Sequence, residues 1–148
     1  MTLQELLDRE EIRVLLATYN AEGDRGNVQG LASVFTEDGV LMAGSGFTAH
    51  GRHGIVDTLT SRRSDGQPRH RPAFLRHNLT TSKISFEDGE TAHGRTYFVV
   101  FSDLGPDHMG VYTDLFRKVD GAWRIAHRRV RIDWSTEGSA VPATRTRV

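Results

Sequence analysis

The amino-acid sequence predicts an α+β domain in which three N-terminal helices pack on a curved antiparallel sheet and enclose a deep pocket. Two observations carry this prediction. Apolar residues recur at helical spacing in the first part of the chain, and four long stretches rich in β-branched and aromatic residues follow. A chain of 148 residues is also the size of one domain, which we expect to span residues 1–134.

The predicted helices come first. The longest starts at Thr2 and ends near residue 22, because Thr2 with Glu5 three residues later matches a capping box. Its later turns are apolar nearly all round, which is typical of a helix enclosed by other structure. A short helix follows, capped by Asn27 and with Phe35 on its apolar side. The third helix spans Arg52–Arg62.

Strand signals fill most of the remaining chain. The four long strand candidates are Ala73–Phe86, Glu90–Ser102, His108–Val119 and Ala122–Trp134. Asp88-Gly89 and Asp120-Gly121 are strong signals for hairpin turns between them. Val40–Met42 and the region of Phe47 are shorter candidates around a glycine turn. We expect a loop at residues 63–72, and at Ser135–Val148 either a frayed tail or an arm that rests on a partner subunit.

The composition excludes several classes of function. Cysteine is absent, which removes disulfides, thiolate nucleophiles and cysteine-bound metals. Nineteen basic residues balance nineteen acidic ones, so no net field attracts nucleic acid or an anionic membrane surface. His50 and His53 lie three apart without a third ligand at a fitting spacing, and no glycine-rich phosphate loop is present. We therefore expect a cytoplasmic protein that uses no metal or cofactor and binds neither nucleic acid nor membrane.

Polar residues that the periodicity places inside are the candidates for chemistry. His77 shares a strand face with Leu75 and Leu79, and Asp24 lies just beyond the buried half of the first helix. Taken singly, each has a structural explanation, as a hydrogen-bonded core histidine and a turn-forming aspartate. Together they form an acid–base pair, because a carboxylate on one imidazole nitrogen fixes the tautomer and directs the other nitrogen at a substrate. Tyr19 either donates to developing oxyanion charge or is a core tyrosine.

The third long strand carries a second group of candidates, Tyr112 and Asp114, on one face. Their cross-strand partners depend on the length of the turn that follows. A two-residue turn pairs Asp114 with His127 and puts Arg129 in the row of Tyr112. A three-residue loop with a bulge puts Arg128 opposite Tyr112 instead. An inward aspartate with such an arginine is either a substrate-binding pair or a structural ion pair in the sheet.

Several motifs together resemble one family. They are Asp8-Arg9-Glu10-Glu11-Ile12, Tyr19 with Asp24, Leu31–Gly39, Gly51-Arg52, Arg76–Thr80, Gly110–Asp114 and Asp120–Ile125. As a set they make the chain similar to the SnoaL-like domain of the NTF2-like superfamily, which includes scytalone dehydratase, steroid Δ-isomerase and polyketide cyclases. The resemblance covers about residues 6–134 and implies an α+β cone fold. It does not single out one activity, since the superfamily includes several types of enzyme and non-catalytic binders.

The resemblance also implies roles for particular positions. Asp24 and His77 match the acid–base pair of the dehydratase-like and dehydrochlorinase-like members. Arg128 matches an arginine that lines their pocket, which favours the bulged register, and Asp114 resembles the carboxylic acid of the isomerase oxyanion hole. Where that isomerase carries its proton-shuttling aspartate, this chain has Leu41-Met42-Ala43. A mechanism centred on histidine is therefore the better match.

These observations predict a cofactor-independent general acid–base enzyme that acts on a small apolar or polycyclic carbonyl compound. His77 is the expected base, Asp24 orients it, and Tyr19 is the third catalytic residue. The residues expected to bind the substrate are Tyr112, Asp114 and Arg128. Dehydration or another elimination is the leading reaction, followed by cyclisation and isomerisation. The competing prediction is a non-catalytic module of the same fold that binds small molecules or serves in assembly.

The outer face of the sheet predicts a homo-oligomer. His93, Arg95 and Tyr97 or their neighbours must point away from the helices, and this second face needs a cover. Together with the family resemblance, this favours a dimer or trimer. In the strand candidate Ala92–Ser102, a second histidine of scytalone dehydratase has no counterpart other than His93.

Overall fold

A computed structural model describes residues 1–44, 46–65 and 72–144 of the chain. Within these residues the elements follow in the order α1 (Leu3–Asp24), α2 (Val28–Ala32), β1 (Phe35–Ala43), β2 (Phe47–His50), α3 (Gly51–Asp65), β3 (Leu75–Phe86), β4 (Thr91–Ser102), β5 (Gly105–Val119) and β6 (Ala122–Ser135). The α+β class predicted from the sequence is confirmed. Most of the expected loop at residues 63–72 lies outside the described residues.

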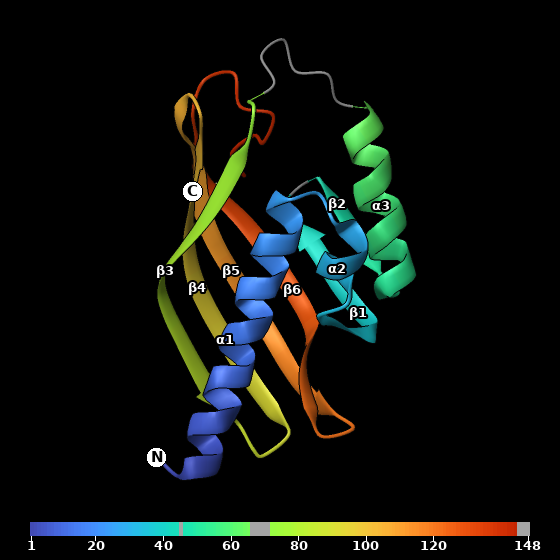
Figure 1. Cartoon of the computed structure of the whole chain (residues 1–148), viewed down its shortest axis with the longest axis vertical. Helices are drawn as coiled ribbons and strands as arrows, with labels where there is room; N and C mark the ends of the chain where they lie inside the picture. The colour runs from blue at the N-terminus through green and yellow to red at the C-terminus, as the bar shows by residue number, and fades with distance from the viewer. Residues whose placement is uncertain (45, 66–71, 145–148) are drawn as a thin grey trace.

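The strands form one curved sheet of six strands in the order β2-β1-β6-β5-β4-β3. β3 to β6 make the expected antiparallel meander. The sheet is mixed rather than wholly antiparallel, because β1 pairs with β6 in parallel and then turns back into β2. Figure 1 shows α1 crossing in front of the sheet, with α2 and α3 beside β1 and β2. The helices therefore cover one face and leave the other face of the sheet open.

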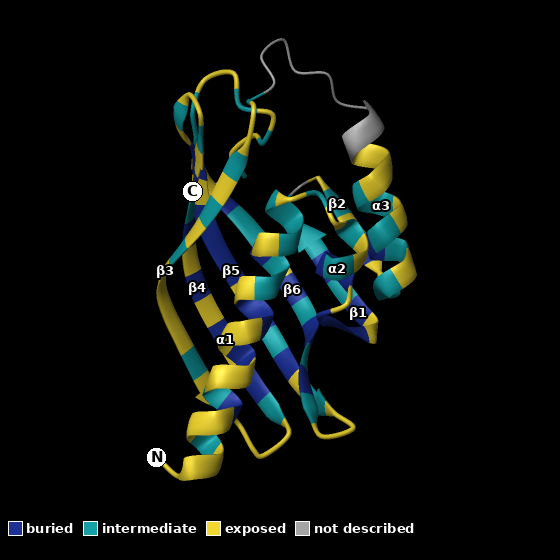
Figure 2. Ribbon diagram, in the orientation of Figure 1, coloured by how far each residue is buried: buried dark blue, intermediate teal, exposed yellow. Residues whose placement is uncertain are grey.

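α1 packs on the sheet along one side. Its start is capped as the sequence predicts, since the Thr2 hydroxyl accepts a hydrogen bond from the Glu5 backbone N–H at 3.1 Å. Ile12 and Leu16 are buried, whereas Val14 is 55% exposed. The later turns are thus not enclosed on all sides as expected, because only the inner face of the helix meets the sheet (Figure 2). No helix among the described residues is both long and apolar enough to span a membrane.

The second helix is shorter than the sequence predicts. Asn27 caps it through a hydrogen bond from the Gly30 N–H at 3.0 Å, but the helix ends at Ala32. Phe35 opens β1 instead of continuing the helix. Pairing with β6 decides this, because the Val34 carbonyl accepts from the Ile125 N–H at 2.9 Å. Sheet hydrogen bonds with a distant segment therefore override the local helical pattern.

The register of β5 and β6 differs from both alternatives read from the sequence. The connection is a two-residue turn, in which Asp120 has φ 50° and Gly121 has φ 78°. A β-bulge then follows within the strands, so that Leu115 pairs with His127 whereas the next residue pairs with Ile125. As a result Asp114 lies opposite Arg128, and Val130 lies opposite Tyr112.

The physical reason is an extra residue in β6. Ala126 has no partner in the register, and it is buried beside the buried Ile125. A bulge of this kind reverses which face the following residues occupy. The inward set on β6 consequently changes from Trp123 and Ile125 to Arg128 and Ile132.

The segment predicted to be a frayed tail or an arm on a partner subunit folds back, as far as residue 144, on the sheet of its own chain. We call residues 136–144 the C-terminal arm. At one end the Thr136 N–H donates to the Asp107 carbonyl at 2.8 Å. At the other end the Thr144 N–H donates to the Ile132 carbonyl at 2.8 Å, and the Ile132 N–H donates to the Thr144 hydroxyl at 3.0 Å. Val141, between these anchors, packs on the hydrophobic cluster beneath. The arm is thus held by backbone pairing and apolar packing, neither of which its Ser/Thr/Ala-rich composition indicates.

Candidate active site

The structure brings Asp24 and His77 together, although they lie 53 residues apart in the chain. Asp24 is the last residue of α1, and His77 lies on β3. The His77 Nδ1 atom lies 2.6 Å from Asp24 Oδ1, and the His77 backbone N–H donates to Asp24 Oδ2 at 2.9 Å. Both carboxylate oxygens therefore hold the same residue, which restricts the orientation of the imidazole.

The charge state of this pair follows from its contacts. Burial raises the pKa of Asp24, but the hydrogen bonds from the side chain and backbone of His77 outweigh burial, and the net pKa is lowered. The carboxylate is therefore ionised at neutral pH and only accepts hydrogen bonds. Because it accepts at Nδ1, the Nε2 atom of His77 remains as the nitrogen for a bound molecule.

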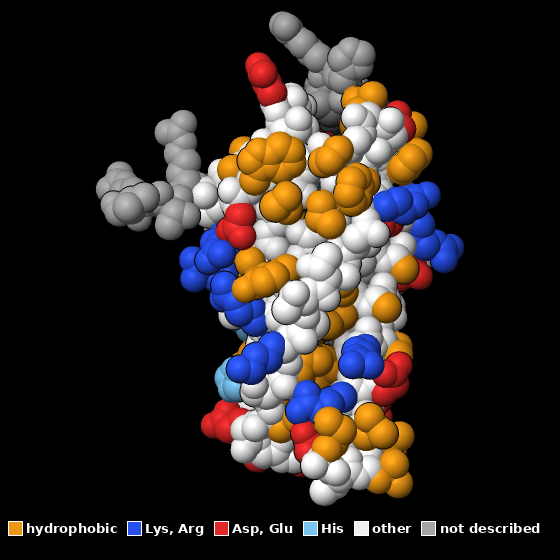
Figure 3. All heavy atoms as spheres, turned by 90° about the vertical axis from the view of Figure 1, so that its left-hand side faces the viewer, with side chains coloured by type: hydrophobic (Ala, Val, Ile, Leu, Met, Phe, Trp, Pro, Cys, Tyr) orange, Lys and Arg blue, Asp and Glu red, His pale blue; other side chains and the backbone are white. Residues whose placement is uncertain are grey.

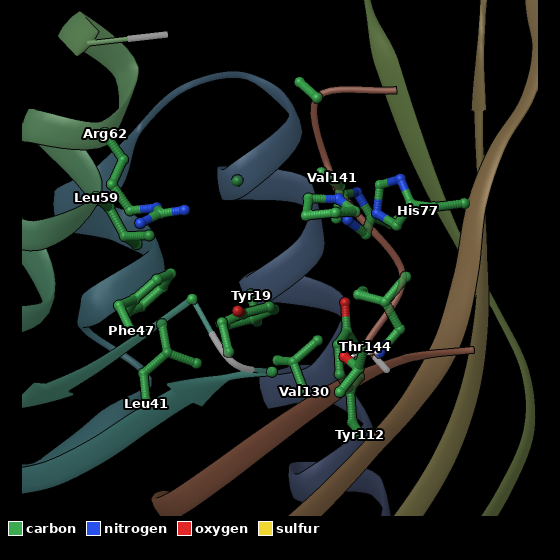
Figure 4. A pocket seen from close by; sticks show the side chains of 18 of the residues that line it. Tyr19, Leu41, Phe47, Leu59, Arg62, His77, Tyr112, Val130, Val141 and Thr144 are labelled. Carbon is green, nitrogen blue, oxygen red and sulfur yellow. Dashed lines mark hydrogen bonds between the residues drawn. The ribbon is translucent and has the colours of Figure 1, made fainter. Parts of the chain in front are cut away.

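A cavity of about 330 Å³ lies against this pair. Its wall is mainly apolar and comes from α1, β1, α3, the sheet and the C-terminal arm. The lining residues include Tyr19, Leu31, Leu41, Phe47, Leu59, Arg62, His77, His108, Tyr112, Val130, Ile132, Val141 and Thr144. Figure 4 shows His77 pointing in from the sheet, with Arg62 reaching in from the opposite side on α3. The described lining residues contain no acidic side chain, and Arg62 carries their one permanent charge.

A second aspartate–histidine pair faces the first, and the sequence reasoning missed it. The His108 Nδ1 atom lies 2.6 Å from Asp107 Oδ2, and both residues are buried. The rings of His77 and His108 have their centroids 6.0 Å apart. Val100 pairs with His77 on one side and with His108 on the other, so the two histidines share one row of the sheet. Counting register from the Asp88-Gly89 turn would not have found this pair, because an irregularity between Leu79 and Ser82 shifts the pairing of β3 by one residue.

The electrostatics of the second histidine differ from those of an exposed imidazole. Burial lowers the pKa of His108, although the hydrogen bond to Asp107 opposes this effect. A positive charge on His77 lowers the pKa of His108 further. A protonated His77 therefore disfavours a second positive charge on His108.

The other predicted residues lie at two depths. Tyr19 and Tyr112 line the cavity, and burial raises the pKa of each phenol, so both stay protonated. Asp114 and Arg128 lie behind them as an ion pair whose side chains have no exposed surface. Arg128 Nε and Nη2 donate to the two oxygens of Asp114 at 2.8 Å each.

The buried arginine is also enclosed by aromatic rings. Its guanidinium carbon lies 4.2 Å from the ring centroid of Tyr19 and 4.1 Å from that of Tyr112. The Tyr112 hydroxyl donates to Asn20 Oδ1 at 3.0 Å. Arg128 and Asp114 thus do not line the cavity, and they pack behind the two tyrosines that do. The ion pair was expected to contact substrate, but neither of its residues lines the cavity in this structure.

A match to the family model of the SnoaL-like domain covers residues 4–129. The chain belongs to the SnoaL-like domain family. In this SnoaL-like domain Leu41 and Ala43 supply the part of the cavity wall that comes from β1, so the wall is apolar where the steroid isomerase resemblance would require a carboxylate. Among the described residues no cluster of three or more histidine and acidic side chains could hold a metal ion.

Solved structures share the fold over nearly the whole chain. A protein of Novosphingobium aromaticivorans that is assigned by inference as a scytalone dehydratase is 25% identical, with a TM-score of 0.80 and coverage of 97% of this chain and 95% of that chain. An NTF2-like protein with a cystatin-like fold from the same organism is 30% identical, with a TM-score of 0.73 and coverage of 93% and 88%. A hexachlorocyclohexane dehydrochlorinase of Novosphingobium barchaimii is 20% identical, with a TM-score of 0.77 and coverage of 90% and 92%, which shows the fold alone. No curated protein matches the chain.

Proposed function

We propose that this SnoaL-like domain is a cofactor-independent acid–base enzyme that eliminates water, or a comparable leaving group, from a small apolar carbonyl compound. The observation that carries the proposal is the His77 imidazole, which is held by the Asp24 carboxylate at 2.6 Å and lines an apolar cavity. A base in that position can remove a proton next to a carbonyl group. The 25% identical relative that is assigned as a scytalone dehydratase supports elimination of water as the leading reaction.

The reaction needs only proton transfer. His77 Nε2 takes the proton from the carbon next to the carbonyl, and the electron pair of that C–H bond forms the new double bond. The bond from the next carbon to its hydroxyl group breaks, and the hydroxyl leaves as water when the His77 imidazolium returns its proton to it. Asp24 stabilises the imidazolium that forms on His77. Tyr19 remains protonated because burial raises its pKa, so it can donate a hydrogen bond to the carbonyl oxygen as negative charge develops.

The cavity supports a small substrate with one polar end. Its volume of about 330 Å³ is at the lower limit of ligand pockets, which are commonly about 300–1,000 Å³. The apolar wall favours a compound of one or two rings. Arg62, whose guanidinium lies 4.8 Å from the ring centroid of Phe47, is available to a ligand oxygen at the end opposite His77 (Figure 4). A compound with an oxygen at each end and a hydrocarbon body fits this arrangement.

A proton-exchange assay tests the proposal without knowledge of the natural substrate. The protein in D₂O is incubated with phenylacetone and indanone, and with the aldol of acetone and benzaldehyde, whose dehydration gives an ultraviolet-absorbing enone. We expect catalysed deuterium incorporation next to the carbonyl in at least one ketone, and enone formation from the aldol. Binding of these ketones, detected by calorimetry, without exchange or elimination would support the non-catalytic binding module instead.

The outer face of the sheet supports a homo-oligomer as a further prediction. Tyr97, Met109 and Trp134 are each more than 40% exposed there. Figure 3 shows the side of the molecule on which β3 and β4 lie, where hydrophobic side chains gather toward the upper end and again at the lower right, with Lys and Arg between these groups. We expect light scattering to give a dimer or trimer, and Met109→Glu to shift it toward the monomer. A wild-type chain that is a monomer at all concentrations would contradict this.

A further inference from the structure

The second aspartate–histidine pair is held from outside its own strand. Asp107 Oδ2 lies 2.6 Å from His108 Nδ1, and the same oxygen accepts a hydrogen bond from the Ser139 hydroxyl at 2.7 Å. The Thr136 N–H donates to the Asp107 carbonyl at 2.8 Å. The C-terminal arm therefore binds both the backbone and the side chain of the residue that orients His108.

The same arm closes the cavity. Ala140, Val141, Pro142 and Thr144 belong to its wall, directly after the serine that binds Asp107. The Val141 N–H donates to the Ser139 hydroxyl at 3.1 Å, which couples the wall residue to the serine. Because the far end of the arm is anchored by Thr144 on β6, the wall and the Asp107 contact form when one segment docks.

We propose that Ser139 is a positioning residue that acts through Asp107, and that the docked C-terminal arm orients His108 as the partner of His77 in proton transfer. The inference rests on the proposed function and extends it to a third element of the fold. With Nδ1 of each histidine bound to its own aspartate, both Nε2 atoms remain for the molecule in the cavity. His77 can then take the proton from carbon and return it to the departing hydroxyl, while the unprotonated Nε2 of His108 accepts a hydrogen bond from that hydroxyl and holds it in place, so no external acid is needed.

The ionisable groups around His108 determine the sign of the pH effect. Asp107 is its neighbour on β5, His77 faces it from β3, and Asp24 lies behind His77 on α1. Ser139, from the arm, shares the Asp107 oxygen and is neutral. Without the Ser139 hydrogen bond, Asp107 is less stabilised as an anion and accepts more strongly from His108, which raises the pKa of His108. The acidic limb of the rate profile should therefore move to higher pH.

The test compares Ser139→Ala with Glu137→Gln, an exposed position in the same arm. We expect Ser139→Ala to lower kcat for the aldol about tenfold with little change in KM, and to move the acidic limb to higher pH. Ser139→Thr, which restores a hydroxyl group, should recover most of the loss. Glu137→Gln should match the wild-type protein. An unchanged kcat and pH profile in Ser139→Ala, with His108→Gln as active as wild type, would overturn the inference.

A measurement that does not depend on turnover separates this inference from the proposed function. In ¹⁵N spectra of the wild-type imidazoles, we expect His108 to be in the Nδ1–H tautomer and Ser139→Ala to shift that signal, whereas the His77 signal stays in place. If the ketones show no exchange but the His108 signal responds to Ser139, the positioning holds and the proposed function fails. A His108 signal that is the same in both proteins refutes the positioning, whatever the activity.

Discussion

Replacement of His77 by glutamine is expected to reduce the rates of exchange and elimination by about 10²–10⁴-fold, the usual contribution of a positioned general base. Glutamine fills a similar volume and can still hydrogen-bond to Asp24, but it cannot take a proton. KM should change little, since the cavity wall remains apolar. The rates are measured by deuterium incorporation into the ketones and by enone absorbance from the aldol.

Two further variants locate the effect. Asp24→Asn removes the charge that stabilises the imidazolium and lets the imidazole adopt the other tautomer, so a loss approaching that of the His77 variant is expected. Asn78→Ala serves as the control, because Asn78 is the exposed neighbour on β3 and its side chain donates to the Arg76 carbonyl. Its rates should equal those of wild type. Full activity in a folded His77→Gln protein would exclude the imidazole as the base.

Replacement of Arg128 by methionine is expected to destabilise the fold by about 3–5 kcal/mol. The arginine and Asp114 have no exposed side-chain surface, so the variant leaves a carboxylate buried with no opposite charge. It also removes the cation that lies between the rings of Tyr19 and Tyr112 at about 4 Å from each. Urea unfolding followed by circular dichroism measures the change in the free energy of unfolding.

A double variant distinguishes the unpaired charge from lost packing. Arg128→Met combined with Asp114→Leu replaces both partners by apolar side chains, and such exchanges are often neutral. We expect the double variant to recover most of the lost stability, whereas exposed Arg129→Met should have almost no effect. A single Arg128 variant as stable as wild type would show that the pair does not support the tyrosine layer.

The sequence contains enough local information for most of the elements. The Thr2 cap, the turn at Asp120-Gly121 and the β-rich stretches each act through neighbours in the chain, and each appears as expected. The pairing of Asp24 with His77 was also predictable, because a helix end and an inward strand position carry complementary chemistry. These features depend on short-range geometry or on a family pattern that spans the fold.

The features that failed to emerge from the sequence all depend on contacts between distant segments. Phe35 belongs to β1 rather than to the predicted helix, because the Val34 carbonyl accepts a hydrogen bond from β6. The extra residue Ala126 shifts the register so that Arg128 lies opposite Asp114. His108 became a site residue only when two hairpin registers placed it in the row of His77.

The sequence by itself thus determined an α+β domain and pointed to His77 and Asp24 as a pair, since periodicity and turn chemistry act locally. Only the tertiary structure decided that Arg128 lies behind the wall, because one bulged residue reverses the inward face of a strand. It likewise decided that the C-terminal arm covers the cavity, because the backbone bonds that hold residues 136–144 are made to strands and leave no pattern in the arm itself.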